Sequence, residues 1–215
     1  MIVDERYTTY LNSLYPELSQ VLSQIRQEAL ESYVPIIRLE TINLLRTLIK
    51  MKRPKKILEV GAAVGFSACL MAETSDGETT ITTIENYEPR IPIAKENFKR
   101  AGYHDKITLL EGDAMDILPT LEGQYDFIFM DAAKGQYINF WPEIKRLIKA
   151  GGVVVTDNVL QDGDIIESRF AITRRNRTIH KRMREYLFEL THDEGFTTTI
   201  LPLGDGVSIS VKGIK

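Results

Sequence analysis

Acidic side chains stand at or just beyond the ends of five short β-rich runs of this sequence, and carboxylates gathered in one place can bind cations or ligand hydroxyls. The runs begin at residues 57, 79, 107, 127 and 153. In open α/β sheets, ligands bind outside the carboxyl ends of the strands, so these acids are expected to face one site. A single acid after a strand is as often a turn former or a helix cap. The five acids are Glu59, Glu85, Asp113, Asp131 and Asp157.

A cation site is predicted where the last two of these runs end. Asp131 opens the segment DAAK, and Asp157 and Asn158 belong to the segment TDN. Carboxylate and amide oxygens from adjacent strand ends suit Mg²⁺ or Ca²⁺ and leave positions open for water or a substrate. Lys134 follows Asp131 by three residues and is a candidate general base beside that cation. The alternative is that Lys134 is a solvated loop cation and Asn158 a turn residue.

A turn with two glycines follows the first run, in the segment EVGAAVGFS that begins at Glu59. Gly61 and Gly65 let the backbone approach a ligand closely, and a helix that starts near Ser67 offers free amides. The spacing is GxxxG, whereas a dinucleotide pyrophosphate is bound by GxGxxG. A nucleoside without phosphates is therefore the better ligand for this turn.

The next two acids are placed to hold such a nucleoside. Glu85 ends the second run, where a carboxylate can accept hydrogen bonds from both hydroxyls of a ribose. The segment GDA ends the third run, where Asp113 can accept a hydrogen bond from an adenine amine and Ala114 leaves room for the ring. Taken alone, GDA is a weak signal.

Hydrophobic periodicity predicts the elements that position these residues. Apolar stripes at helical spacing predict two helices over 18–29 and 42–49. From residue 55, β-rich runs alternate with helical stripes, and the runs at 57, 127 and 153 are apolar at nearly every position, as in parallel strands covered on both faces. The last two runs, from 197 and 207, are separated by a short Gly-Asp-Gly turn and can pair as an antiparallel hairpin.

Length and composition exclude several classes of protein. With 215 residues, of which 43% are hydrophobic, the chain suits one domain over 1–215. No apolar run approaches the roughly 20 residues that cross a bilayer, and no basic start precedes an apolar stretch, so we expect a cytoplasmic protein with no membrane partner. Because Cys69 is the only cysteine, an intrachain disulfide and a multi-thiolate zinc site are excluded.

The charge is unevenly distributed along the chain. The formal net charge is −3, which argues against a protein that coats nucleic acid. Between Arg169 and Arg184, however, there are seven cations and no carboxylate. This basic stretch either binds phosphates of an RNA or is a solvated helix face. The residues predicted to bind RNA are Arg174, Arg175, Arg177, Lys181 and Arg182.

The motifs EVGAAVGFS, TIE, GDA, MDAAK and TDN, in this order, resemble those of class I S-adenosylmethionine-dependent O-methyltransferases of the catechol and caffeoyl-coenzyme A type. Within that family the chain is similar to the short bacterial tRNA 5-hydroxyuridine methyltransferases. The resemblance implies an α/β, Rossmann-like fold: a mostly parallel seven-stranded sheet with a C-terminal antiparallel hairpin, helices on both faces and two extra N-terminal helices. These helices form a cap over 1–54 in front of a core over 55–215.

The resemblance also implies a role for each site residue. Mg²⁺ is expected at Asp131, Asp157 and Asn158, and Lys134, beside Asp131, is expected to remove the proton. Where the family often has an acid between those two catalytic residues, this chain has Ala132 and Ala133. The residues expected to contact S-adenosylmethionine are Ile37, Glu59, Gly61, Ser67, Glu85, Asp113, Ala114 and Asp131.

The activity expected from these residues is Mg²⁺-dependent methyl transfer to the 5-hydroxyl of 5-hydroxyuridine at the tRNA wobble position, which gives 5-methoxyuridine. The basic stretch would bind the tRNA anticodon loop. An alternative acceptor is a small catechol or hydroxycinnamoyl compound, because it also offers two adjacent oxygens to the metal. A non-catalytic nucleotide-binding regulator is a third hypothesis. The many apolar positions in the leading helices predict a homodimer.

Overall fold

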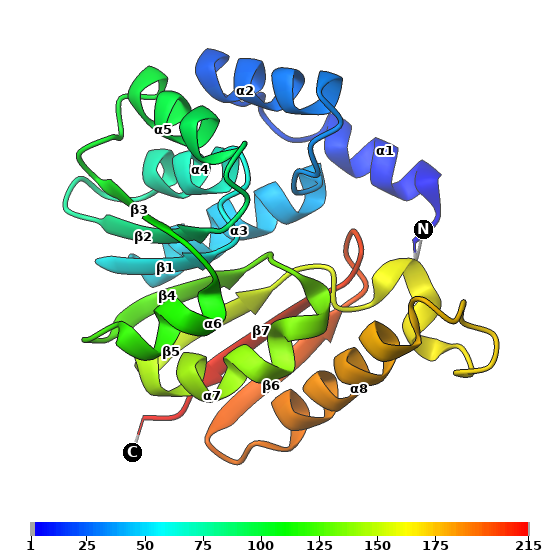
Figure 1. Ribbon diagram of the computed structural model, residues 1–215. Helices are drawn as coiled ribbons and strands as arrows, with labels where there is room; N and C mark the ends of the chain where they lie inside the picture. The colour runs from blue at the N-terminus through cyan, green and yellow to red at the C-terminus, as the bar shows by residue number, and fades with distance from the viewer. Residues whose placement is uncertain (1–2, 215) are drawn as a thin grey trace.

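A single mixed β-sheet crosses the centre of the protein (Figure 1), in a computed structural model that describes residues 3–214. The strand order is β3-β2-β1-β4-β5-β7-β6, with the first five strands parallel and β7 antiparallel to both of its neighbours. The predicted seven-stranded sheet with its C-terminal hairpin is confirmed. The strands are β1 (Lys56–Val60), β2 (Thr80–Glu85), β3 (Ile107–Glu111), β4 (Tyr125–Met130), β5 (Ile148–Thr156), β6 (Phe196–Leu201) and β7 (Val207–Lys212).

Helices cover both faces of the sheet and create two apolar cores (Figure 1). The residues of β4 alternate between them: Phe127 and Phe129 belong to one core, and Ile128 and Met130 belong to the other. This two-sided burial explains why the central runs are apolar at nearly every position. The core helices are α4 (Phe66–Thr74), α5 (Ile91–Arg100), α6 (Ala114–Ile117), α7 (Tyr137–Leu147) and α8 (Arg177–His192), with 3₁₀ turns η1 (Leu118–Thr120), η2 (Lys134–Gln136) and η3 (Gln161–Ile166).

Three helices precede β1, whereas the sequence predicted two. The predicted pair corresponds to α2 (Gln20–Glu31) and α3 (Leu39–Lys52), which pack on α4. The additional helix, α1 (Glu5–Ser13), buries none of its side chains, so a search for core-facing stripes does not find it. Its Tyr7 and Tyr10 are exposed, and the homodimer stays a prediction. Among residues 3–214, no helix combines the length and the apolarity needed to cross a membrane.

The turn between β6 and β7 packs against the chain that follows β5. The amide of Val159 donates to the carbonyl of Gly206 at 3.0 Å, and the amide of Leu160 donates to the carbonyl of Asp205 at 2.9 Å. Gly206 has a φ of +90°, and a Cβ placed on it would lie 2.5 Å from Leu160 Cβ and 2.7 Å from Leu160 N. Only glycine allows this close approach, so the hairpin turn is fixed beside the end of β5.

We predict that Gly206→Ala lowers the free energy of unfolding by about 3 kcal/mol, since it adds a steric overlap to the strain of a left-handed backbone. The control is Gly123→Ala, because Gly123 has a φ of +93° but open space around its Cβ position. That variant should lose only about 1 kcal/mol. Urea unfolding of both variants measures the difference, and equal losses would show that the contact with Leu160 imposes no constraint.

Candidate active site

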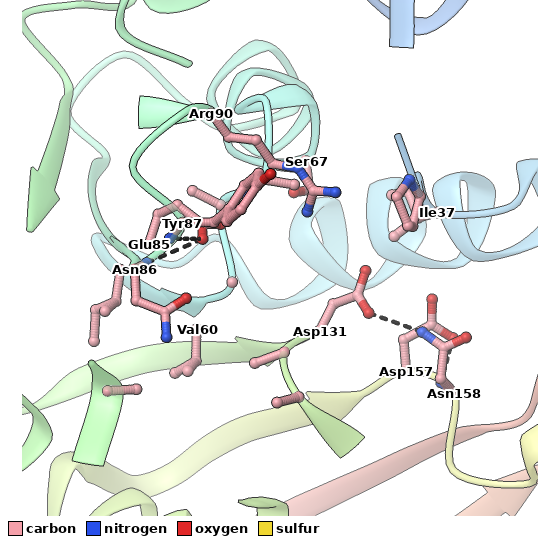
Figure 2. Close-up of a pocket in the computed structure, with 18 of the residues that line it drawn as sticks. Ile37, Val60, Ser67, Glu85, Asn86, Tyr87, Arg90, Asp131, Asp157 and Asn158 are labelled. Atoms are coloured by element: carbon pink, nitrogen blue, oxygen red, sulfur yellow. Dashed lines mark hydrogen bonds between the residues drawn. The ribbon is translucent and has the colours of Figure 1, made fainter. Parts of the chain in front are cut away.

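The carboxyl ends of the parallel strands open into a pocket of about 850 Å³. Every residue predicted for cofactor, metal or catalysis lines this pocket, except Glu59. Figure 2 shows Glu85 on one side and Asp157 and Asn158 on the other, with Asp131 between them. We call the two parts the Glu85 end, with Glu85, Asp113 and Ala114, and the Asp131 end, with Asp131, Lys134, Asp157 and Asn158.

The turn between β1 and α4 passes close to the end of β4. A Cβ on Gly61, whose φ is +102°, would lie 2.2 Å from the carbonyl oxygen of Asp131. Gly65 begins α4 with a φ of +79°, and a Cβ there would lie 2.4 Å from the ring of Phe98. Both glycines are required for packing within the protein, and Gly61 also lines the pocket. The predicted glycine turn therefore lies beside the pocket, and its contact with a ligand stays a prediction.

Glu85 is held in position by the backbone around it. Its Oε2 accepts a hydrogen bond from the amide of Ala63 at 2.6 Å, and its Oε1 accepts from the amides of Asn86 and Tyr87 at 3.0 and 2.8 Å. The carboxylate therefore ties the glycine turn to the end of β2. Each oxygen has two lone pairs, so Glu85 can still accept hydrogen bonds from ribose hydroxyls.

Asp113 is both a helix cap and a pocket residue. Its Oδ1 accepts a hydrogen bond from the amide of Met115 at 2.8 Å, which caps α6. The two interpretations of this acid are therefore compatible, because the second oxygen remains for a ligand. The neighbouring Ala114 is buried and lines the pocket.

Glu59 lies behind the pocket wall. Its Oε2 accepts a hydrogen bond from Thr83 Oγ1, while its Oε1 is buried without a hydrogen-bond partner in residues 3–214. Full burial raises the pKa of Glu59 to about 7. Side chains alternate along a strand, so Val60 lines the pocket and Glu59 faces away from it. Glu59, predicted to contact the cofactor, is therefore not among the residues that line the pocket.

Hydrogen bonds between strand ends bring the predicted metal ligands together. The amide of Asp131 donates to the carbonyl of Val60 at 3.0 Å, and the amide of Asp157 donates to the carbonyl of Met130 at 3.0 Å. Asn158 has a left-handed backbone with a φ of 63°, and its Nδ2 donates to Asp131 Oδ1 at 2.8 Å (Figure 2). The three polar side chains therefore share the Asp131 end.

Electrostatics favours a cation at the Asp131 end. Burial and the charge of Asp131 raise the pKa of Asp157 to about 7. Burial also raises the pKa of Asp131, against the effects of the hydrogen bond from Asn158 and the charge of Lys134. These hard oxygen donors fit Mg²⁺ or Ca²⁺. Within residues 3–214, no three His, Cys, Asp or Glu side chains gather at a metal site, so Asn158 is the third candidate ligand.

Sequence reasoning treated Asp205 only as part of a hairpin turn, yet it lines the pocket. Its side chain is 15% exposed and forms an ion pair with Arg38. Burial and a hydrogen bond with Asp162 raise the pKa of Asp205, while the charge of Arg38 lowers it. No signal in the sequence shows that this turn returns to the ends of β4 and β5, because the contact depends on the sheet order.

Two further lining residues were missed at the Glu85 end. Arg90 places its guanidinium 5.0 Å from the ring centroid of Tyr87, a cation–π contact, and both side chains border the pocket (Figure 2). They follow Glu85 in the loop before α5. The only available signal was their position directly after a strand-end acid.

None of the residues predicted to bind RNA lines the pocket, and one of them, Arg182, contacts a segment that does. Arg182 donates to the carbonyl of Gly135 at 3.2 Å, so α8 contacts η2 beside Lys134. Arg177 donates to the carbonyl of Ile172, and Lys181 pairs with Glu185. The exposed cations of this set that form no ion pair with any residue of 3–214 are Arg174 and Arg175.

This sheet, with its antiparallel closing hairpin and a pocket at the strand ends, defines a Rossmann-like methyltransferase fold. The sequence profile of the O-methyltransferase family matches residues 12–213. The chain therefore belongs to the O-methyltransferase family and is an S-adenosylmethionine-dependent enzyme.

Relatives and solved structures agree with this assignment. Caffeoyl-CoA O-methyltransferase 1 of Arabidopsis thaliana is 30% identical over 96% of this chain and 83% of its own. A Staphylococcus aureus crystal structure named for the same enzyme type has a TM-score of 0.87 and 33% identity, with 97% of this chain and 98% of that chain covered. The S-adenosylhomocysteine-bound methyltransferase PaMTH1 of Podospora anserina also has a TM-score of 0.87, with 26% identity over 98% of this chain and 95% of that chain.

We predict that, without divalent cations, the melting temperature falls as the pH rises from about 5 to 8. In the unfolded chain Asp157 ionises near pH 4, but in the folded protein its pKa is about 7. This group therefore favours folding at low pH, and the benefit is lost as the pH rises between these two values. A cation site formed by the ionised pair predicts that Mg²⁺ raises the melting temperature more at pH 8 than at pH 5.

Thermal melts of the wild type and of Asp157→Asn provide the measurement and its control. The variant should show a smaller fall with pH, since Glu59 still contributes in the same direction, and little response to Mg²⁺. A Mg²⁺ response that is equal at both pH values, or that persists in the variant, would contradict a cation site at Asp157.

Proposed function

We propose that this enzyme transfers the methyl group of S-adenosylmethionine to a hydroxyl of a small catechol or hydroxycinnamoyl acceptor, with the help of Mg²⁺. The observation that carries the proposal is the two-ended pocket, in which a nucleoside-compatible Glu85 end adjoins a cation-compatible Asp131 end. Relatives named caffeoyl-CoA O-methyltransferases support this class of acceptor.

The Glu85 end would hold the methyl donor. Glu85 would accept hydrogen bonds from the ribose hydroxyls, and Asp113 would accept one from the adenine amine. Ala114 is buried and leaves room for the ring. Ile37, only 4% exposed, covers the pocket from the N-terminal cap (Figure 2). These contacts would hold the donor with water largely excluded.

The Asp131 end would hold the acceptor. Mg²⁺, held by Asp131, Asp157 and Asn158, would fix the acceptor oxygen and lower its pKa. Lys134 would take the hydroxyl proton at Nζ, and the oxygen would then attack the methyl carbon in line. A carbon–oxygen bond forms as the carbon–sulfur bond breaks, and S-adenosylhomocysteine leaves with the sulfur electron pair. Two adjacent oxygens on the acceptor suit such a cation.

We expect methylation of a catechol or of caffeoyl-coenzyme A to stop when EDTA is added and to resume with excess Mg²⁺. Asp157→Ala should behave like the chelated enzyme, because it removes one anionic oxygen ligand of the cation. Transfer of radiolabelled methyl from S-adenosylmethionine measures both effects. Methyl transfer that is unchanged by EDTA would contradict the proposed role of a cation.

Lys134→Ala separates proton removal from binding. Its turnover should fall by about two orders of magnitude or more, as for loss of a general base. Its affinity for S-adenosylhomocysteine, measured by calorimetry, should stay unchanged. A parallel loss of that affinity would show that Lys134 contributes to the donor site and is not the base.

A second candidate is methylation of 5-hydroxyuridine in the anticodon loop of a tRNA. The observation that favours it is the exposed pair Arg174 and Arg175, near the α8 end that contacts Gly135 at the pocket. Phosphates of a nucleic acid could bind these cations while a flipped base enters the Asp131 end. The 5-hydroxyl and the 4-carbonyl of this base form the same adjacent oxygen pair as a catechol.

For this candidate, Arg174→Ala combined with Arg175→Ala should weaken tRNA binding and lower its salt-dependence slope by about 2. Arg177 is left in place because it supports the backbone at Ile172. The matched control replaces Lys50 and Lys99, two exposed cations on the helices of the other layer. Filter binding at several salt concentrations measures the slopes. Equal slopes for both double variants would show that the basic stretch is a solvated helix face and does not bind the tRNA.

A further inference from the structure

Arg38 directly follows Ile37 and stands at the start of α3, where a side chain often caps the helix. Its side chain makes no capping hydrogen bond. Instead, Nη2 lies 2.5 Å from Asp205 Oδ1 and 3.1 Å from Asp162 Oδ1. One guanidinium from the cap thus joins two carboxylates from the core. We call these three residues the clasp.

Both carboxylates of the clasp belong to segments anchored next to the predicted metal ligands. Asp205 lies in the β6–β7 turn, which accepts the amide hydrogen bonds of Val159 and Leu160. Asp162 lies two residues beyond Leu160, in a left-handed backbone with a φ of 56°. The clasp therefore runs from the cap to the Asp131 end of the pocket.

The Arg38–Asp205 pair is better packed than most surface ion pairs, which contribute little to stability. Asp205 exposes only 15% of its side chain, whereas Asp162 exposes 56%. The aliphatic part of Arg38 rests on the same turn, since a Cβ on Gly204 would lie 3.4 Å from Arg38 Cδ. The closer and more buried ion pair of the clasp is therefore the one with Asp205, while Arg38 Nη2 donates its hydrogen bond to Asp162 Oδ1.

We propose that Arg38 is a positioning residue whose contact with Asp205 keeps Ile37 closed over the bound methyl donor. Both Ile37 and Arg38 line the pocket, and Ile37 is 4% exposed. The donor cannot leave past this segment unless the clasp opens. Arg38 acts through Ile37 and Asp205 and need not touch the reacting atoms.

The fold does not depend on this contact. The cap is held on the core by α2 and α3, which pack on α4. Leu45 and Ile49 of α3 are fully buried in that interface, far along the helix from Arg38. Loss of the clasp should therefore free the segment at Ile37 while the cap helices stay in place.

The experiment measures binding of S-adenosylhomocysteine to the full chain without acceptor or divalent cation. Arg38→Met and Asp205→Asn should each weaken binding about tenfold, mainly through a faster dissociation rate in stopped-flow measurements. The double variant should bind no more weakly than either single variant, because both remove the same contact. Arg38→Lys, which keeps the charge, should recover part of the affinity.

Asp162→Asn is the matched control, because it removes the more exposed carboxylate from the same guanidinium and keeps a residue that tolerates a left-handed backbone. Its affinity should change less than about twofold. The proposal would be overturned if Arg38→Met bound like the wild type, or if the losses of the two single variants multiplied in the double variant. Since no acceptor is present, failure of the catechol assay would leave this result standing.

Discussion

The mutual repulsion of Asp131 and Asp157 is the interaction on which the site depends. Parallel pairing of β4 and β5 places the two carboxylates side by side, and burial removes the water that would separate their charges. Protonation of one carboxylate, the charge of Lys134 or a bound cation can reduce this repulsion. In the proposed mechanism, a dication bound by both carboxylates and the acceptor oxygen would neutralise this repulsion.

The rest of the pocket is rigid where it meets the donor. Glu85 is fixed by three backbone amides, and Gly61 allows the first turn to touch the carbonyl of Asp131. Groups that are already ordered before binding lose little entropy when the ligand arrives. The exception is the segment around Ile37, which belongs to the cap and reaches the core through side chains. A pocket with a rigid base and a movable segment around Ile37 suits an enzyme that must release its product.

Much of this arrangement could be predicted from the sequence, because it depends on strand ends. Continuous apolar runs located the parallel strands, and the residues after them met in one pocket. Glu59 was the exception, since strand alternation turns it behind the wall. Arg38 and Asp205 could not be found in this way: their proximity results from how the cap and the hairpin pack, which no local pattern encodes. For the same reason α1, with no buried side chain, gave no signal.

The position of β7 has a consequence for how the chain reaches its native state. β7 follows β6 in the chain but lies between β5 and β6 in the sheet. β6 therefore cannot join the sheet until β7 has been made, and β5 keeps an open edge until then. Unpaired edges of apolar strands promote aggregation of incompletely folded chains. During synthesis, the edge of β5 therefore stays unpaired until the last strand has been made.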